Sequence, residues 1–382
     1  MEPLTYAQIL SAVIVQFTPV WIGLIVIMGA SAVFKARLSL YGRLFDSPIG
    51  MIGLGLVLFW LLTAIFANQI ALFDPLEQFR ALKNKPPGTF EPESAVAALF
   101  GGDNLGRDVF SRMVHGSVTV MQIAPVATLF ALMVGITLGL PAGYYGGRID
   151  TTLSFVANLV LAFPVILLFY LLVTPEIRST VIPTAMAAVL FLIPILFFVT
   201  FFYSKFNTRP DVLWLYLGPT IAIGAFAYLH LTNLWTPTGT WMAPNTLNIF
   251  VSVVFVTSPA VFRIVRGLTM DIKTRDYVAA AQTRGEGPWY IMLWEVLPNA
   301  RGPLIVDACL RIGYTTILLG TLGFFGLGVS PESSDWGMTI NEGRKLLRLY
   351  PHAALPPALA IMTLVLGLNL LADGLREQSL KD

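Results

Sequence analysis

The residues of this chain that are best spaced to perform a task lie between Asp276 and Asn299, DYVAAAQTRGEGPWYIMLWEVLPN. A helix that begins at Asp276 places positions i, i+3, i+4 and i+7 on one face. Those positions hold Tyr277, Ala280, Ala281 and Arg284. We expect the helix to end at Gly285, because glycine readily takes the left-handed conformation that closes helices. The alanines leave little side-chain bulk, so the predicted chemistry is recognition of a soluble partner that docks closely.

Residues for catalysis, metal binding or cofactor binding form no such pattern. The single cysteine, Cys309, lies in an apolar stretch, and His115, His230 and His352 are far apart in the chain. The sequence has no G-x-x-x-x-G-K-[ST] phosphate loop. We therefore predict no catalytic residue, no metal and no cofactor in this chain. A membrane-embedded enzyme would need a clustered acid, base or nucleophile, and if ATP is used, another chain binds it.

Asp307 and Arg311 are four residues apart in a second apolar stretch, so a helix would place them on one face. An unpaired charge in hydrocarbon costs at least roughly 2.5–3.5 kcal/mol on insertion scales. One interpretation is a charge that faces a pathway or a partner subunit. The other is a self-neutralised pair near the cytoplasmic end of the helix, where arginine can extend to the interface.

Composition indicates what must position these residues. The 382-residue chain is 56% hydrophobic and 12% charged, whereas a soluble domain is about 25% charged. Uncharged runs long enough to cross a bilayer predict an all-α, polytopic membrane protein. We predict nine spans, at residues 9–34, 49–72, 117–142, 151–173, 181–203, 212–232, 246–262, 303–328 and 353–372.

Basic residues predict the orientation. They follow the first span and then occupy alternate loops, densest around 263–302, whereas the opposite side has fewer, mostly in the long 73–116 loop. The positive-inside rule therefore predicts an external N-terminus and a cytoplasmic C-terminus and 263–302 loop. Trp235 and Trp241 are expected in the interfacial aromatic belt. No basic run suggests nucleic acid.

The segment around 276–299 resembles the "EAA" loop of ABC-transporter permeases. The matching residues are Ala280, Ala281, Gly285, Leu297 and Pro298. Ala279 stands where that motif usually has glutamate, and Glu295 where an apolar residue or histidine is common. The resemblance implies a coupling helix that seats in a groove of a cytoplasmic ATPase. Accordingly, we expect Ala281→Arg to uncouple transport by overfilling that groove.

Further blocks extend the resemblance. The stretch GGDNLGRDVFSRMVHG, at 101–116, is rich in glycine and charge, so we expect it to be a loop rather than core. It is similar to a signature of the dipeptide/oligopeptide/nickel importer permeases, in the second permease type. The matching positions are Gly102, Asp103, Gly106, Arg107, Asp108, Ser111, Arg112 and Gly116. Later blocks match at Gly143–Gly147, Asp150, Ala162–Pro164, Gly326–Gly328, Trp336–Gly337, Asn369 and Asp373–Arg376.

The resemblance implies a six-helix permease core with about three additional transmembrane helices. The core would comprise 49–173, with the external loop 73–116, and 246–382, with the coupling loop 263–302. Residues 1–48 would add an N-terminal helix and linker, and 174–245 a two-helix insertion, which we expect to be dispensable for coupling. The implied partners are a homologous permease, two ATPase subunits or domains that bind ATP and Mg, an extracytoplasmic solute-binding protein and membrane lipid. Peptides are the first implied solute, ahead of nickel chelates and oligosaccharides.

Two alternatives stay open. An ion-gradient-driven secondary transporter often keeps functional acids at mid-membrane depth, and here only Asp307 is clearly inside a span. For the external loop, Asp103, Arg107, Asp108 and Arg112 would either brace a docking site for the binding protein or only support the fold. We expect Arg107 and Asp108 to fix this loop through charge-assisted hydrogen bonds.

Overall fold

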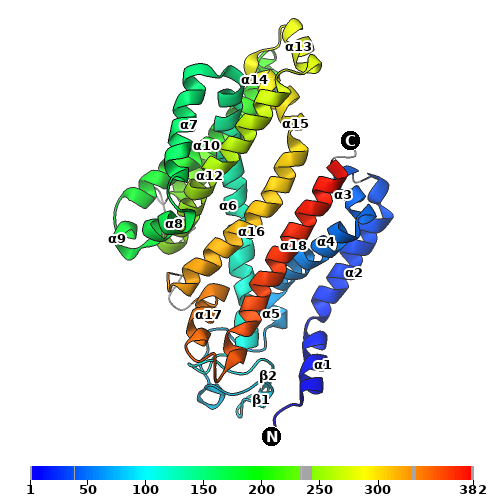
Figure 1. The fold of residues 1–382 in the computed structure, drawn as a ribbon, viewed down its shortest axis with the longest axis vertical. Helices are drawn as coiled ribbons and strands as arrows, with labels where there is room; N and C mark the ends of the chain where they lie inside the picture. The colour runs from blue at the N-terminus through cyan, green and yellow to red at the C-terminus, as the bar shows by residue number, and fades with distance from the viewer. Residues whose placement is uncertain (1, 38, 233, 235–242, 328–332, 380–382) are drawn as a thin grey trace. The chain divides into compact units, whose positions relative to one another are not determined.

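The computed structural model describes residues 2–37, 39–232, 234, 243–327 and 333–379, so Trp235, Trp241 and Gly328 lie outside the described residues. The protein is all-α and polytopic, as predicted (Figure 1). Seven described helices are long and apolar enough to cross a membrane, or up to nine spans if each of two bent pairs counts as one. The seven are α4 (Pro48–Ile65), α6 (Val109–Tyr145), α10 (Ile182–Phe206), α11 (Pro210–Leu231), α12 (Pro244–Ile272), α16 (Arg301–Phe324) and α18 (Leu355–Ser379).

The bent pairs replace two spans that the sequence predicted as single helices. Helices α1 (Tyr6–Gln16) and α2 (Thr18–Val33) meet at 53°, and α7 (Gly147–Leu161) and α8 (Val165–Val173) at 80°. Each break lies beside a proline, Pro19 in the first turn of α2 and Pro164 directly before α8. Proline has no backbone N–H to continue a helix, and its ring restricts the preceding residue. The Ala162-Phe163-Pro164 block therefore marks a sharp bend.

Short elements connect these helices. They are η1 (Lys35–Arg37), α3 (Ser39–Arg43), η2 (Leu44–Asp46), α5 (Ala67–Ile70), η3 (Arg80–Leu82), α9 (Pro175–Arg178), α17 (Trp336–Arg344) and η5 (Pro351–Ala353). Two short strands, β1 (Thr89–Phe90) and β2 (Ala97–Ala98), pair antiparallel with Thr89 opposite Ala98. The chain divides into two compact units, residues 1–125 with 309–382 and residues 126–308.

The first unit is built around close packing of α4 against α18, which run side by side in Figure 1. Glycines allow the approach: a Cβ added to Gly374 would lie 2.5 Å from the Gly50 Cα, and one added to Gly53 would lie 2.3 Å from the Leu371 nitrogen. Small residues at such crossings are common in membrane helices. The Trp60 indole N–H also donates to the Thr363 hydroxyl at 3.0 Å.

The second unit is built around α12, whose apolar stretch is mostly buried. The C-terminal part of α6 lies against it through a stripe of glycines at i, i+4 and i+8: Gly135, Gly139 and Gly143. A Cβ added at any of them would come within 3 Å of α12 atoms. Helices α7, α8 and α10 also contact α12.

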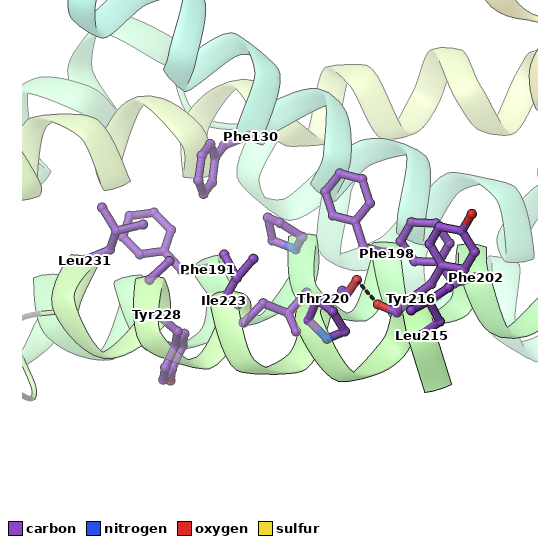
Figure 2. Close-up of a pocket in the computed structure, with 15 residues that line it drawn as sticks. Phe130, Phe191, Phe198, Phe202, Leu215, Tyr216, Thr220, Ile223, Tyr228 and Leu231 are labelled. Carbon is purple, nitrogen blue, oxygen red and sulfur yellow. Dashed lines mark hydrogen bonds between the residues drawn. The ribbon is translucent and has the colours of Figure 1, made fainter. Parts of the chain in front are cut away.

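Helix α11 packs mainly on α10 and is the least buried of the candidate spans. Between these two helices and α6 lies an apolar groove of about 460 Å³ (Figure 2). Phe130, Phe191 and Phe198 point into it, and its lining contains no Asp, Glu, Lys, Arg or His. The groove therefore suits hydrocarbon and offers no charge to a polar solute.

Candidate functional site

Helix α13 (Asp276–Thr283) ends where the sequence predicted. Gly285 has φ of +80°. Its N–H donates to the Gln282 carbonyl at 2.9 Å, and the Glu286 N–H donates to the Ala281 carbonyl at 3.2 Å. These are the two hydrogen bonds of a Schellman motif, which requires a left-handed residue at this position. The turn therefore depends on glycine for its backbone conformation.

The residues that are buried and exposed on α13 differ from those that the sequence predicted. Val278 and Ala281 are fully buried, whereas Tyr277, Ala280 and Arg284 are exposed. Ala281 faces an apolar cluster of its own chain. Its predicted place on the docking surface is therefore wrong, because helical spacing cannot tell which of two adjacent alanines turns inward. The exposed residues of the helix that are available to a partner are Asp276, Tyr277, Ala279, Ala280, Gln282 and Thr283, with Arg284 at the cap.

Beyond Gly285 the chain forms α14 (Pro288–Tyr290), a π-helical turn η4 (Ile291–Val296) and α15 (Leu297–Asn299). Leu297 is half-buried and Pro298 is exposed. Single π-helical turns are rare and frequently occur at functional sites. The Arg284 guanidinium donates to the Glu295 carboxylate at 2.9 Å. Glu295, which departs from the resembled motif, thus forms an ion pair with Arg284 within residues 276–299, here called the coupling segment.

The block at 140–150 supports the coupling segment. The Lys273 ammonium donates to the carbonyls of Gly143 (2.8 Å) and Tyr144 (3.1 Å), which lie at the end of α6. The Gln282 amide donates to the Tyr144 hydroxyl at 3.3 Å. Gly146 and Gly147 have positive φ at the turn between α6 and α7, whereas Gly143 is helical and lets α12 approach.

A second polar site lies in the first unit and consists of Asp103, Arg107, Arg112 and Glu342, here called the arginine cluster. Asp103 accepts from the Arg107 side chain (2.7 Å) and from the backbone N–H groups of Leu105 (2.8 Å) and Arg107 (2.9 Å). Arg107 also pairs with Glu342. As predicted, charge-assisted hydrogen bonds hold this loop.

Arg112 is completely buried at the start of α6. One of its terminal nitrogens donates to Glu342 (3.2 Å), to the Thr339 hydroxyl (3.1 Å) and to the Ser333 carbonyl (3.3 Å). The prediction that 101–116 is a loop holds for 101–108, which lie in no helix. It is wrong for 109–116, since α6 begins at Val109 and its first turns are buried. The sequence analysis also did not predict Glu342. The signal that could have found it is that a buried arginine needs an acidic partner.

Asp108 also forms a hydrogen bond in this loop, but the predicted assistance by its charge stays a prediction. Its Oδ2 accepts from the Ser111 N–H at 2.8 Å, and the Ser111 hydroxyl accepts from the N–H groups of Leu72 (3.0 Å) and Phe73 (3.1 Å). The other oxygen, Oδ1, has no hydrogen-bond partner among the described residues. Burial raises the pKa of this carboxyl to about 6, because the charged form loses its hydration.

Trp336, from the block at 336–337, completes the site by packing on Gly116. The Trp336 indole donates to the Met113 carbonyl at 2.7 Å, and a Cβ on Gly116 would lie 2.3 Å from the Trp336 ring. Asp335 caps α17 by accepting from the Met338 N–H at 2.8 Å. Blocks more than 200 residues apart in the sequence therefore build one polar site.

Asp307 and Arg311 both lie on α16, as the sequence predicted. Arg311 is buried, at 8% exposed, and Asp307 is half-buried. Which interpretation of the pair holds, a pathway charge or mutual neutralisation, stays a prediction.

Comparison with known proteins places these features in a family. Residues 212–379 match the family described as binding-protein-dependent transport system inner membrane component, and residues 40–87 match the N-terminal TM domain of oligopeptide transport permease C. The glutathione transport system permease protein GsiD of Pectobacterium atrosepticum is 31% identical over 74% of this chain and 71% of its own length. The dipeptide transport system permease protein DppC of Haemophilus influenzae is 29% identical over 86% of this chain and 88% of its own. The di/tripeptide permease DppC of Pseudomonas aeruginosa is 29% identical over 91% and 93%.

Proposed function

Because this chain belongs to the binding-protein-dependent transport permeases, within the dipeptide/oligopeptide ABC importer family, we propose that it couples to cytoplasmic ATPases through residues 276–299. The exposed side of α13 carries this proposal. It presents Tyr277, Ala280 and Arg284 beside a helix end made rigid by its Schellman motif. A small-faced, rigid helix can seat in a groove with little loss of conformational entropy.

The assembly that we propose has one further permease, homologous to this chain, to complete the pathway. Two ATPase subunits or domains bind ATP and Mg and move the seated coupling helices, which switches the pathway between inward- and outward-open forms. The density of basic residues around 263–302 supports a cytoplasmic position for this loop and the C-terminus, with the N-terminus external. The membrane is then the cell membrane of the organism.

For the solute, we propose small peptides. The names of the similar proteins concern dipeptides, di/tripeptides and glutathione, all of which contain amide bonds and charged termini. An external binding protein would deliver the solute near the loop 73–116. Whether the arginine cluster contributes to that docking, or only supports the fold, is tested by Arg107→Ala: lost assembly indicates fold support, and weakened docking with intact assembly indicates a direct role.

The coupling proposal is tested at adjacent alanines. Ala280→Arg adds a bulky charge to the exposed side of α13, so the permease should fold normally but lose its ATPase subunits on affinity purification from its native membrane. Ala36→Arg, on an exposed residue of η1, is the control and should keep them. Ala281→Arg should instead destabilise the permease itself, because Ala281 is buried. Normal ATPase recovery with Ala280→Arg would overturn the proposal.

A further inference from the structure

The last turns of α10 lie directly against the coupling segment within the second unit. The Trp294 indole N–H donates to the Ser204 hydroxyl at 3.2 Å. The Phe201 ring lies 4.5 Å from the Trp294 ring, centroid to centroid, and the Lys205 ammonium lies 4.1 Å from the Trp294 ring centroid. Three side chains at i, i+3 and i+4 near the end of one helix thus contact a single tryptophan.

The same contact continues into the apolar core beneath α13. Phe197 and Phe201 of α10 pack against the cluster that contains Val278, Ala281 and the buried residues of η4. Ser204 itself is buried, at 8% exposed. Trp294 is half-buried, and Ser204 supplies the acceptor that its indole N–H needs away from water. The contact is therefore both apolar and directional.

Adjacent residues of η4 connect in two directions. Trp294 binds α10 through Ser204, and Glu295 binds the end of α13 through Arg284. The π-helical turn between Ile291 and Val296 lacks the regular hydrogen-bond ladder of an α-helix. Side-chain contacts at both residues therefore link the end of α13 to α10 through this turn.

We propose that α10 is a strut that positions the coupling segment, with Trp294 and Ser204 as its joint. This inference deepens the proposed function and rests on it for its consequence in transport. It also reverses our expectation that 174–245 is dispensable for coupling. Removing the insertion would expose the Trp294 ring and the apolar side of the coupling segment, so Trp294 and Ser204 act as positioning residues.

The strut is tested first in the isolated full-length permease, by hydrogen exchange of the amides in 288–299. Ser204→Ala and Trp294→Phe remove the hydrogen bond and should accelerate this exchange about 2- to 10-fold, as expected for the loss of one hydrogen bond. Ser204→Thr keeps the hydroxyl and should restore slow exchange. Trp289→Phe is the matched control, because Trp289 packs on the same cluster without a hydrogen bond from its indole among the described residues. Exchange in α4 and α18 should stay unchanged.

The second measurement is ATPase affinity, titrated with the purified ATPase subunits of the same transporter. The apparent Kd should rise about 2- to 10-fold in Ser204→Ala, because the looser segment must be ordered on docking. Unchanged exchange in both Ser204→Ala and Trp294→Phe would overturn the strut. Faster exchange that leaves the ATPase Kd unchanged would also overturn it, provided that Ala280→Arg does abolish ATPase binding. If exchange responds but Ala280→Arg leaves ATPase binding intact, the joint exists and the coupling proposal fails instead.

Discussion

The arginine cluster and the coupling segment use similar residues under opposite constraints. Gly106 and Gly285 have nearly the same φ, +81° and +80°. A Cβ on Gly106 would lie 2.2 Å from the Phe79 carbonyl oxygen, whereas a Cβ on Gly285 would meet nothing within 4 Å. The first glycine is required by both backbone and packing, and the second by backbone alone.

The charged side chains of the two regions also differ in their burial and in their number of partners. In the arginine cluster, Arg112 is fully buried and Arg107 is 4% exposed, and each donates to more than one acceptor or acid. In the coupling segment, the Arg284 side chain is 54% exposed and pairs with Glu295 across one 2.9 Å contact. Buried charges need partners, although the Nε and Nη1 atoms of Arg112 have no hydrogen-bond partner among the described residues. Exposed pairs contribute little. One region is built to keep its shape, and the other leaves surface for a partner.

The largest expected effect comes from removing one buried cation. Arg112→Met leaves Asp103 and Glu342 with fewer partners and should destabilise the protein by about 3–5 kcal/mol. The free energy of unfolding can be measured by titration with SDS in mixed micelles. Arg348→Met is the control, because Arg348 is exposed and should change stability by less than about 0.5 kcal/mol. A small effect at Arg112 would remove the contrast between the two regions.

The next test uses pH. The pKa of Asp108 is raised to about 6, so the folded state holds its proton more tightly than the unfolded state. The stability that this proton contributes is complete below pH 4 and is lost as the pH rises through about 6. Asp108→Asn keeps an acceptor for the Ser111 N–H and should be more stable than the wild type at pH 8, by up to about 3 kcal/mol.

That difference should shrink toward zero near pH 4. The variant should keep a pH dependence of its own, because burial raises the pKa of Asp335 and lowers the pKa of His352, and these two contributions have opposite signs. Unfolding free energies of both proteins from pH 4 to pH 8 check the prediction. Parallel curves for the two proteins would mean that Asp108 does not titrate in this range.

Glycine-to-alanine substitutions separate the stability cost of backbone strain from the cost of packing. Gly285→Ala should cost about 1–2 kcal/mol, the penalty of a left-handed residue with a Cβ. Gly106→Ala should cost more, since its Cβ also meets the Phe79 carbonyl. Gly287→Ala is the control: Gly287 has φ of −70° and open space around it, so alanine should be neutral or slightly stabilising. Equal costs at Gly106 and Gly285 would show that packing does not distinguish them.

The smallest expected effect is at the exposed ion pair. Glu295→Gln removes the charge that pairs with Arg284 and should lower the free energy of unfolding by less than about 1 kcal/mol. High salt should reduce the difference between variant and wild type, because it screens exposed charges. A loss comparable to that of Arg112→Met would show that the coupling segment is as constrained as the arginine cluster.

The sequence by itself determined the features that depend on local pattern. Apolar runs and low charge predicted the membrane helices, and Gly285 predicted the end of α13, because both follow from the properties of neighbouring residues. The blocks of matching residues also identified the family. The two bends at Pro19 and Pro164 were readable in principle, since proline interrupts helical hydrogen bonding.

Only the tertiary structure decided which residues meet across long stretches of chain. It turned Ala281 inward and Ala280 outward, a choice made by the cluster beneath α13. It brought Glu342 to Arg107, 235 residues earlier in the chain, and the end of α10 to Trp294. Such contacts depend on how helices pack against one another, and side-chain periodicity within one helix carries no information about that packing.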